Sequence, residues 1–91
     1  MLSASSMVMA DLEKGLAAFE AQDYDTALTE FTKDAERGVA LAQYNLGLIY
    51  FNGQGVKQDY AKAIEYYQKA ADQGYAAAQY NLGVMYDDTK G

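Results

Sequence analysis

The stretch Ala42-Gln43-Tyr44-Asn45-Leu46-Gly47 occurs twice, because the same six residues return as Ala78-Gln79-Tyr80-Asn81-Leu82-Gly83, 36 positions later (78 − 42 = 36). Around it, nine of the thirteen pairs that align residues 38–50 with 74–86 are identical. The same offset relates Asp23-Tyr24 to Asp59-Tyr60, so the repetition begins before the first hexapeptide. A period of roughly 20 to 50 residues is typical of solenoids, in which stacked units bury a shared core. The sequence therefore predicts a repeat protein of about two and a half units.

Composition narrows the class of protein. The 91 residues suffice for one small domain, and the 51% hydrophobic content without proline favours tightly packed helices. A net charge of −6 with only seven Lys and Arg residues argues against a nucleic-acid partner. No segment approaches the roughly 18 apolar residues of a membrane span, so we expect no membrane insertion.

Catalytic and metal-binding chemistry has few candidate residues. The chain contains no His, Cys or Trp, which removes imidazole bases, thiol nucleophiles and the usual zinc ligands. Asp87-Asp88 is the only adjacent carboxylate pair, and two neighbours supply too few ligands for a specific cation site. We therefore expect neither an enzyme nor a bound metal or cofactor.

Residues 1–10 are uncharged, small and apolar, and they end in Val8-Met9-Ala10 before the acidic Asp11. Small residues at these positions are typical of the end of a signal peptide, although a charged n-region is missing. A signal remnant would place the protein in the bacterial periplasm or outside the cell. The alternative is a frayed extension of the first helix, which would leave a cytoplasmic location open.

Apolar periodicity predicts five helices in the domain of residues 11–91. The first is expected over 11–21, and the second follows the N-cap Asp23 and ends at Gly38. The others are expected over 40–51, 60–73 and 76–87, with Asp59 as the N-cap of the fourth. These helices divide the domain into a first unit (11–38), a complete unit (39–74) and a partial unit (75–91).

The two copies of the hexapeptide helix differ in what is expected to cover them. The helix over 40–51 is apolar on two faces, with Leu46 and Ile49 on one face and Tyr44 and Leu48 on the other, so both faces should be covered. The helix over 76–87 has no helix after it that could cover the same surface. We therefore expect an open face at Leu82, Met85 and Tyr86, which a longer array or self-association into a homodimer would cover.

The hexapeptide and the residues after it resemble the Sel-1-like repeats, relatives of the tetratricopeptide repeats. The matching residues continue through Tyr50, Gly53, Gly55-Val56, Asp59-Tyr60, Ala63, Tyr66-Tyr67, Ala70-Ala71 and Gly74. In the first unit, Gly15 and Ala27 are 12 residues apart where Gly47 and Ala63 are 16 apart, so its spacing is similar to a tetratricopeptide unit. The resemblance implies a right-handed superhelix of antiparallel helix pairs, and an adaptor that binds partners on its concave face.

The resemblance also implies which side chains line that concave face. The expected partner-binding residues are Leu41, Tyr44, Asn45, Leu48, Phe51 and Asn52 in the complete unit, Tyr80, Asn81 and Val84 in the partial unit, and Leu12, Leu16 and Phe19 in the first unit. Such a surface suits an apolar or helical protein segment. Two alternatives remain: the tyrosines could pack between units, and the Asn45 and Asn81 amides could tie adjacent helices together.

Two hypotheses of function follow, a module that binds a protein or peptide partner and a structural protein that self-associates through its last helix. Gly47 and Gly83 are expected where helices cross closely, so Gly47→Leu should lower the melting temperature.

Overall fold

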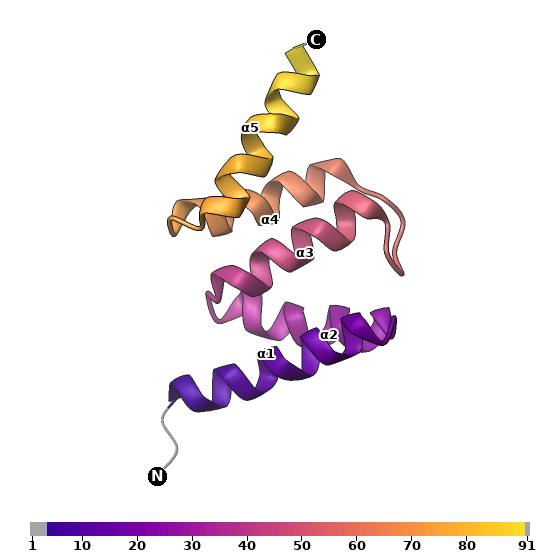
Figure 1. Ribbon diagram of the computed structural model, residues 1–91, viewed down its shortest axis with the longest axis vertical. Coiled ribbons are helices and arrows are strands. Elements are labelled where there is room, and N and C mark those ends of the chain that lie inside the picture. Colours follow the sequence, from indigo (N-terminus) through magenta and orange to yellow (C-terminus); the bar gives the residue numbers. More distant parts are fainter. Residues whose placement is uncertain (1–3, 91) are drawn as a thin grey trace.

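The computed structural model describes the backbone of residues 4–90 and the side chains of residues 12–87. The described residues form five helices: α1 (Ala4–Glu20), α2 (Tyr24–Glu36), α3 (Ala40–Asn52), α4 (Tyr60–Asp72) and α5 (Ala76–Lys90). Each helix packs mainly on its neighbours in sequence, which gives an elongated stack of 52 × 27 × 17 Å with α1 and α5 at opposite ends (Figure 1). The predicted all-α solenoid of antiparallel helix pairs is confirmed, and its handedness stays a prediction.

The helix ends follow the predicted signals. The carboxylates of Asp23 and Asp59 accept hydrogen bonds from backbone N–H groups in the first turns of α2 and α4, at 3.3 and 3.0 Å. Beyond the last turn of α2, Gly38 takes a φ of +88°, and its N–H donates to the Ala35 carbonyl at 3.0 Å. Gly74 ends α4 in the same way with a φ of +82°. A left-handed residue here satisfies otherwise unpaired carbonyls of the last turn, and glycine adopts it without strain.

Two helix boundaries differ from the prediction. Helix α1 begins at Ala4 rather than at residue 11, so residues 4–10 of the N-terminal segment are helical, while residues 1–3 lie outside the described residues. Helix α5 continues to Lys90 rather than ending at residue 87. In both places the chain has no glycine or proline that would end a helix.

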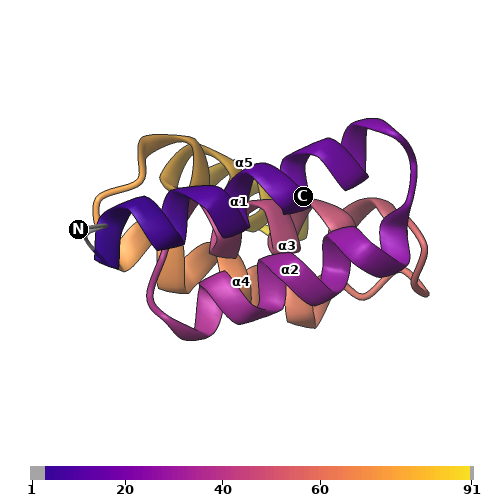
Figure 2. The ribbon, with the colours of Figure 1, turned by 90° about the horizontal axis from the view of Figure 1, so that it is seen from below.

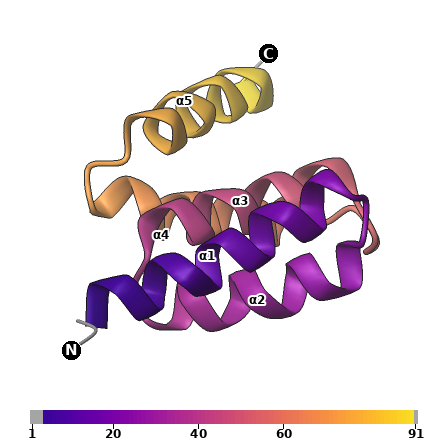
Figure 3. The same cartoon turned by 60° about the horizontal axis from the view of Figure 1, so that its bottom comes forward.

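Two core clusters divide the interior, and α3 contributes to both. The first lies among α1, α2 and α3 around Phe31 and Leu46, and the second lies between α4 and α5 around Tyr67, with Tyr44 and Leu48 of α3 packed against it. Viewed from below, α1 and α2 lie side by side (Figure 2), and α5 forms a separate layer beyond α3 and α4 (Figure 3). The expectation that α3 is covered on two faces is therefore confirmed.

Candidate functional site

A groove of about 240 Å³ lies between α3 and α5. Helix α3 contributes Leu48, Phe51 and Asn52 to its lining, and Tyr67 of α4 reaches it from below. Helix α5 contributes Tyr80, Asn81, Val84 and Met85. None of these eight side chains belongs to Asp, Glu, Lys or Arg, so the groove is built from aromatic, aliphatic and amide groups.

Aromatic side chains fix the base of this groove. The Tyr67 ring is 1% exposed, and its centroid lies 5.6 Å from that of Tyr44. Tyr44 also lies against Tyr75, with 5.2 Å between the centroids. From α5, the Asn81 amide donates to the Tyr44 hydroxyl at 3.4 Å, which links the two copies of the hexapeptide directly. Residues of three helices, α3, α4 and α5, therefore make contact at the base.

Burial favours the uncharged phenols of Tyr67 and Tyr75. Burial raises the pKa of Tyr67 above its ordinary value of 10.0, a hydrogen bond with Asn81 opposes the rise, and the neighbouring Tyr44 adds to it. Burial likewise raises the pKa of Tyr75. With no charged side chain in the lining, the groove favours apolar groups over ions.

The structure brings together half of the predicted partner-binding residues. Six of the twelve line the groove: Leu48, Phe51, Asn52, Tyr80, Asn81 and Val84. Tyr80 and Val84 are 72% and 42% exposed, so α5 presents the more accessible wall. Tyr44 instead packs beneath the groove, against Tyr67 of its own unit and Tyr75 of the next one.

The remaining predicted residues lie outside the groove. Leu12 is buried in the first core cluster, with Leu16, Phe19 and Leu41 packed against that cluster and only partly exposed. The placement of Leu12 on an accessible face is therefore corrected. The shorter first unit explains this, because its apolar side chains are used to cover Phe31: the Phe19 and Phe31 rings lie 6.5 Å apart. Asn45 is partly buried, and its amide nitrogen has no hydrogen-bond partner.

The predicted open face of α5 needs a second correction. Leu82 and Met85 are buried in the second core cluster with Ala63, Tyr67 and Ala70 of α4. They are counterparts of Leu46 and Ile49, which lie in the first cluster with residues of α1 and α2, so this stripe faces the preceding helices. Only Tyr86 of the expected set is substantially exposed, at 48%.

Two lining residues, Tyr67 and Met85, were not predicted to contribute to the groove. Tyr67 belongs to the apolar stripe of α4 and was assigned to the core alone. Its position opposite Gly47 could have indicated more, because a glycine leaves room for a large ring to pass the helix backbone. A Cβ atom on Gly47 would lie 2.5 Å from the Tyr67 ring, which shows how closely the two approach.

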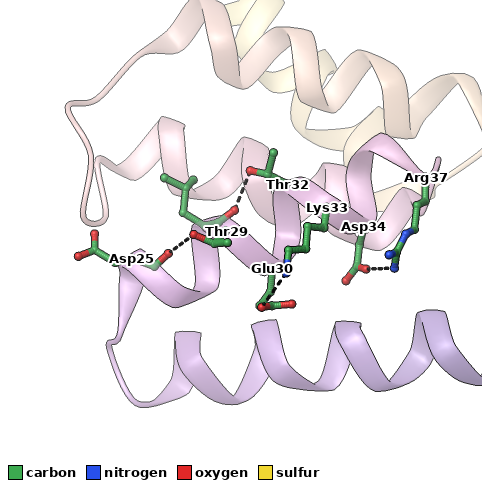
Figure 4. A network of polar contacts seen from close by, with 8 residues as sticks. Asp25, Thr29, Glu30, Thr32, Lys33, Asp34 and Arg37 are labelled. Carbon is green, nitrogen blue, oxygen red and sulfur yellow. Dashed lines mark hydrogen bonds and ion pairs between the residues drawn. The ribbon is translucent and has the colours of Figure 1, made fainter.

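Polar side chains on α2 form a cluster of a different kind (Figure 4). Lys33 lies 3.5 Å from Glu30, and Arg37 lies 3.7 Å from the buried Asp34. Two threonine hydroxyls donate to backbone carbonyls four residues earlier. These contacts all join residues of α2 or its cap, so they are local to this helix: the ion pairs support it and the threonine bonds satisfy hydroxyl groups along it, and they gather no ligand-binding groups.

Other kinds of site find little support. Among the residues with described side chains, no group of three or more Asp and Glu residues is placed to hold a metal ion. None of the helices within residues 4–90 combines the length and the apolar character that crossing a membrane requires.

Comparison with known proteins identifies the repeat. The chain is similar to a crystal structure of a protective antigen present in uropathogenic Escherichia coli strains, described as displaying an SLR fold, with a TM-score of 0.83 and 45% identity over 90% of this chain and 18% of that chain. It is also similar to a Sel1 repeat protein from Oxalobacter formigenes, with a TM-score of 0.71 and 27% identity over 92% of this chain and 37% of that chain.

The chain thus spans well under half of either solved protein. A search of curated proteins found no match. The model of the Sel1 repeat matches residues 40–75 and 76–88, which together are more than half of the sequence. The chain therefore belongs to the Sel1 repeat family.

Proposed function

We propose that this chain is an interaction scaffold that holds an apolar segment of a partner protein in the groove between α3 and α5. Sel1 repeats generally act as protein–protein interaction modules, and their folds are typically non-catalytic scaffolds. The observation that carries the proposal is the uncharged lining, which joins the buried Tyr67 at the base to the exposed Tyr80 and Val84.

The size of the groove indicates what it would hold. Its volume of about 240 Å³ lies below the range of roughly 300–1,000 Å³ typical of small-molecule sites. A groove of this size suits one anchoring side chain of a protein segment, such as an aromatic or a large aliphatic residue. The exposed Asn52 amide, which also lines the groove, would supply hydrogen bonds to the backbone of that segment.

A peptide selection with a charge substitution tests this proposal. Peptides selected from a phage-displayed random library against the full chain should carry an apolar anchor, and Val84→Asp should weaken their binding by about tenfold or more, because it places a carboxylate in an apolar wall. The matched control is Ala61→Asp, which adds the same charge at an exposed position of α4 outside the groove. Circular dichroism checks that both variants fold.

The proposal fails if the selected peptides bind Val84→Asp and the wild type equally well, or if selection yields no peptide that binds. The alternative function is self-association through α5, which the exposure of Tyr80 and Tyr86 favours. Light scattering over a concentration series separates the two: a stable dimer supports self-association, and a monomer near 10.0 kDa supports a scaffold for other proteins.

A further inference from the structure

Helix α5 carries a second surface, which shares only Tyr80 with the groove. The same surface exists on α3, where α4 covers it. On α3 this surface consists of Tyr44, Gly47 and Tyr50. The offset of 36 places Tyr80, Gly83 and Tyr86 at the same positions on α5. We call these three residues of α5 the outer face. Because the residue types are identical, the contacts between α3 and α4 act as a template for what the outer face can bind.

In that template an aromatic ring of α4 sits directly on the glycine. The Tyr67 ring lies so close to Gly47 that a Cβ atom there would be 2.5 Å from it. Tyr66 stacks on Tyr50 with 5.9 Å between centroids and 8° between the ring planes. The Lys62 ammonium lies 5.0 Å from the centroid of the same Tyr50 ring.

The same positions on α5 are open. Tyr80 and Tyr86 are 72% and 48% exposed, and a Cβ atom on Gly83 would meet nothing within 4 Å. The helix is nevertheless held in the template's orientation, because the Gln79 amide donates to the Ala71 carbonyl at 3.1 Å just as Gln43 donates to Ala35 at 3.2 Å. The outer face is thus presented with the geometry that α3 offers to α4.

We propose that the outer face binds an amphipathic helix of a partner protein with the side-chain pattern of α4. Its apolar stripe would reproduce Ala63, Tyr67 and Ala70, with a tyrosine on Gly83 between two alanines spaced i, i+4 and i+7. The small alanines allow the close approach that a glycine-centred contact requires. A second copy of this chain does not offer such a helix in its folded form, because these three residues of α4 are already buried.

One position departs from the template and specifies charge. Phe51 of α3 packs on Tyr60 of α4 with 5.3 Å between the ring centroids. The counterpart of Phe51 on α5 is the exposed Asp87. An aromatic contact is therefore replaced by a carboxylate, so the bound helix carries Lys or Arg seven residues before its tyrosine, where α4 has Tyr60.

The experiment is a titration of the ¹⁵N-labelled full chain with a synthetic peptide of residues 57–75 that carries Tyr60→Lys. Saturable shifts are expected at the amides of Tyr80, Gly83 and Tyr86. Binding should weaken by about tenfold when the peptide also carries Tyr67→Ala, because a central aromatic anchor is lost. A Tyr60→Glu peptide should bind less tightly than the Tyr60→Lys peptide.

A protein variant provides the matched control. Gly83→Leu fills the seat of the incoming ring, and its Cβ atom meets nothing within 4 Å, so its spectrum should remain that of a folded protein while peptide binding is lost. Gly83 does not line the groove, so Gly83→Leu should leave binding of the groove-selected peptides unchanged, and failure of one proposal is distinguishable from failure of the other.

Three results would overturn the proposal: no shifts on the outer face, shifts centred on Leu48 and Phe51 of α3 instead, or equal binding by the Tyr67→Ala peptide. A doubled mass of the unliganded chain in light scattering would also overturn it, because a second copy would then occupy α5.

Discussion

Alanine at three helical glycines tests how the helix pairs are packed. In a helix interior, replacing Gly by Ala stabilises the fold by about 1 kcal/mol, wherever the new methyl group has room. At Gly83 nothing lies within 4 Å of the added Cβ, so the full gain is expected. At Gly47 and Gly15 the same atom would lie 2.5 Å from the Tyr67 ring and 2.7 Å from the Phe31 ring.

Neither ring can move aside easily, because Tyr67 is 1% exposed and Phe31 is fully buried. Overpacking of this kind costs about 1–3 kcal/mol, which offsets or exceeds the propensity gain. Gly47→Ala should therefore be about 1–3 kcal/mol less stable than Gly83→Ala, and the difference in melting temperature should be about 4 °C or more for a domain of this size. Gly15→Ala should behave like Gly47→Ala.

The assay is urea denaturation of the three variants and the wild type, followed by circular dichroism at equal protein concentration. A double-mutant cycle tests whether the Tyr67 ring is the cause. In a Tyr67→Leu background, Gly47→Ala should lower the free energy of unfolding by less, because the ring that opposes the methyl group is gone. If Gly47→Ala stabilises the chain as much as Gly83→Ala does, the inference that the Tyr67 ring leaves no room for a methyl group at Gly47 is refuted.

Three further predictions concern single interactions. Asn81→Leu should destabilise the chain by about 0.5–1.5 kcal/mol in urea denaturation, because it removes the hydrogen bond to Tyr44. Asn45→Leu should be neutral or stabilising, because the amide nitrogen of Asn45 is buried without a hydrogen-bond partner. Equal effects of the two substitutions would contradict this prediction. Asp59→Ala should cost about 1 kcal/mol by the same assay through loss of the N-cap of α4, and an unchanged midpoint would refute the cap. The raised pKa of Tyr67 means that the folded chain keeps this proton to higher pH than the unfolded chain, so stability should fall as the pH rises above about 10. Denaturation midpoints measured across that range should fall less steeply for Tyr67→Phe, and equal slopes would contradict the assignment.

The helices of the repeated region were predictable because their boundaries have local causes. Asp59 and Gly74 act within one turn of the residues they cap, so sequence alone indicates where α4 begins and ends. The start of α1 at Ala4 had no such signal, since a uniform run of small and apolar residues is compatible with a helix of several lengths.

The site was predictable only where the repeat is regular. Six of the twelve residues that the family resemblance implied for the concave face line one groove between α3 and α5. The first unit was not predictable in this way. Between the second and third units, Asn81 donates to the Tyr44 hydroxyl. One unit earlier the donor would be Asn45, and the 32-residue offset between Gly15 and Gly47 places Leu12 at the position of Tyr44 (44 − 32 = 12). Leu12 has no hydroxyl, so this bond has no counterpart in the first unit.

Which helix covers which face of α5 depends on contacts between helices rather than on apolar periodicity. Leu82 and Gly83 are adjacent, yet one is buried against α4 and the other is open. A wheel of α5 alone shows two faces with apolar residues and cannot say which of them the preceding helices use.

The position of α3 between the two core clusters has a consequence for how the chain opens. Separating α3 from the rest disrupts both clusters together, while α5 packs mainly on α4 and can detach with the first cluster intact. Local opening of α5 therefore requires less free energy than global unfolding. A partner segment held by α5, as proposed, would bind only the closed form, so its apparent affinity would be reduced by the fraction of molecules in which α5 is detached. Recognition through α5 would therefore be coupled to local folding, and the packing of α3 in both clusters would confine that opening to α5.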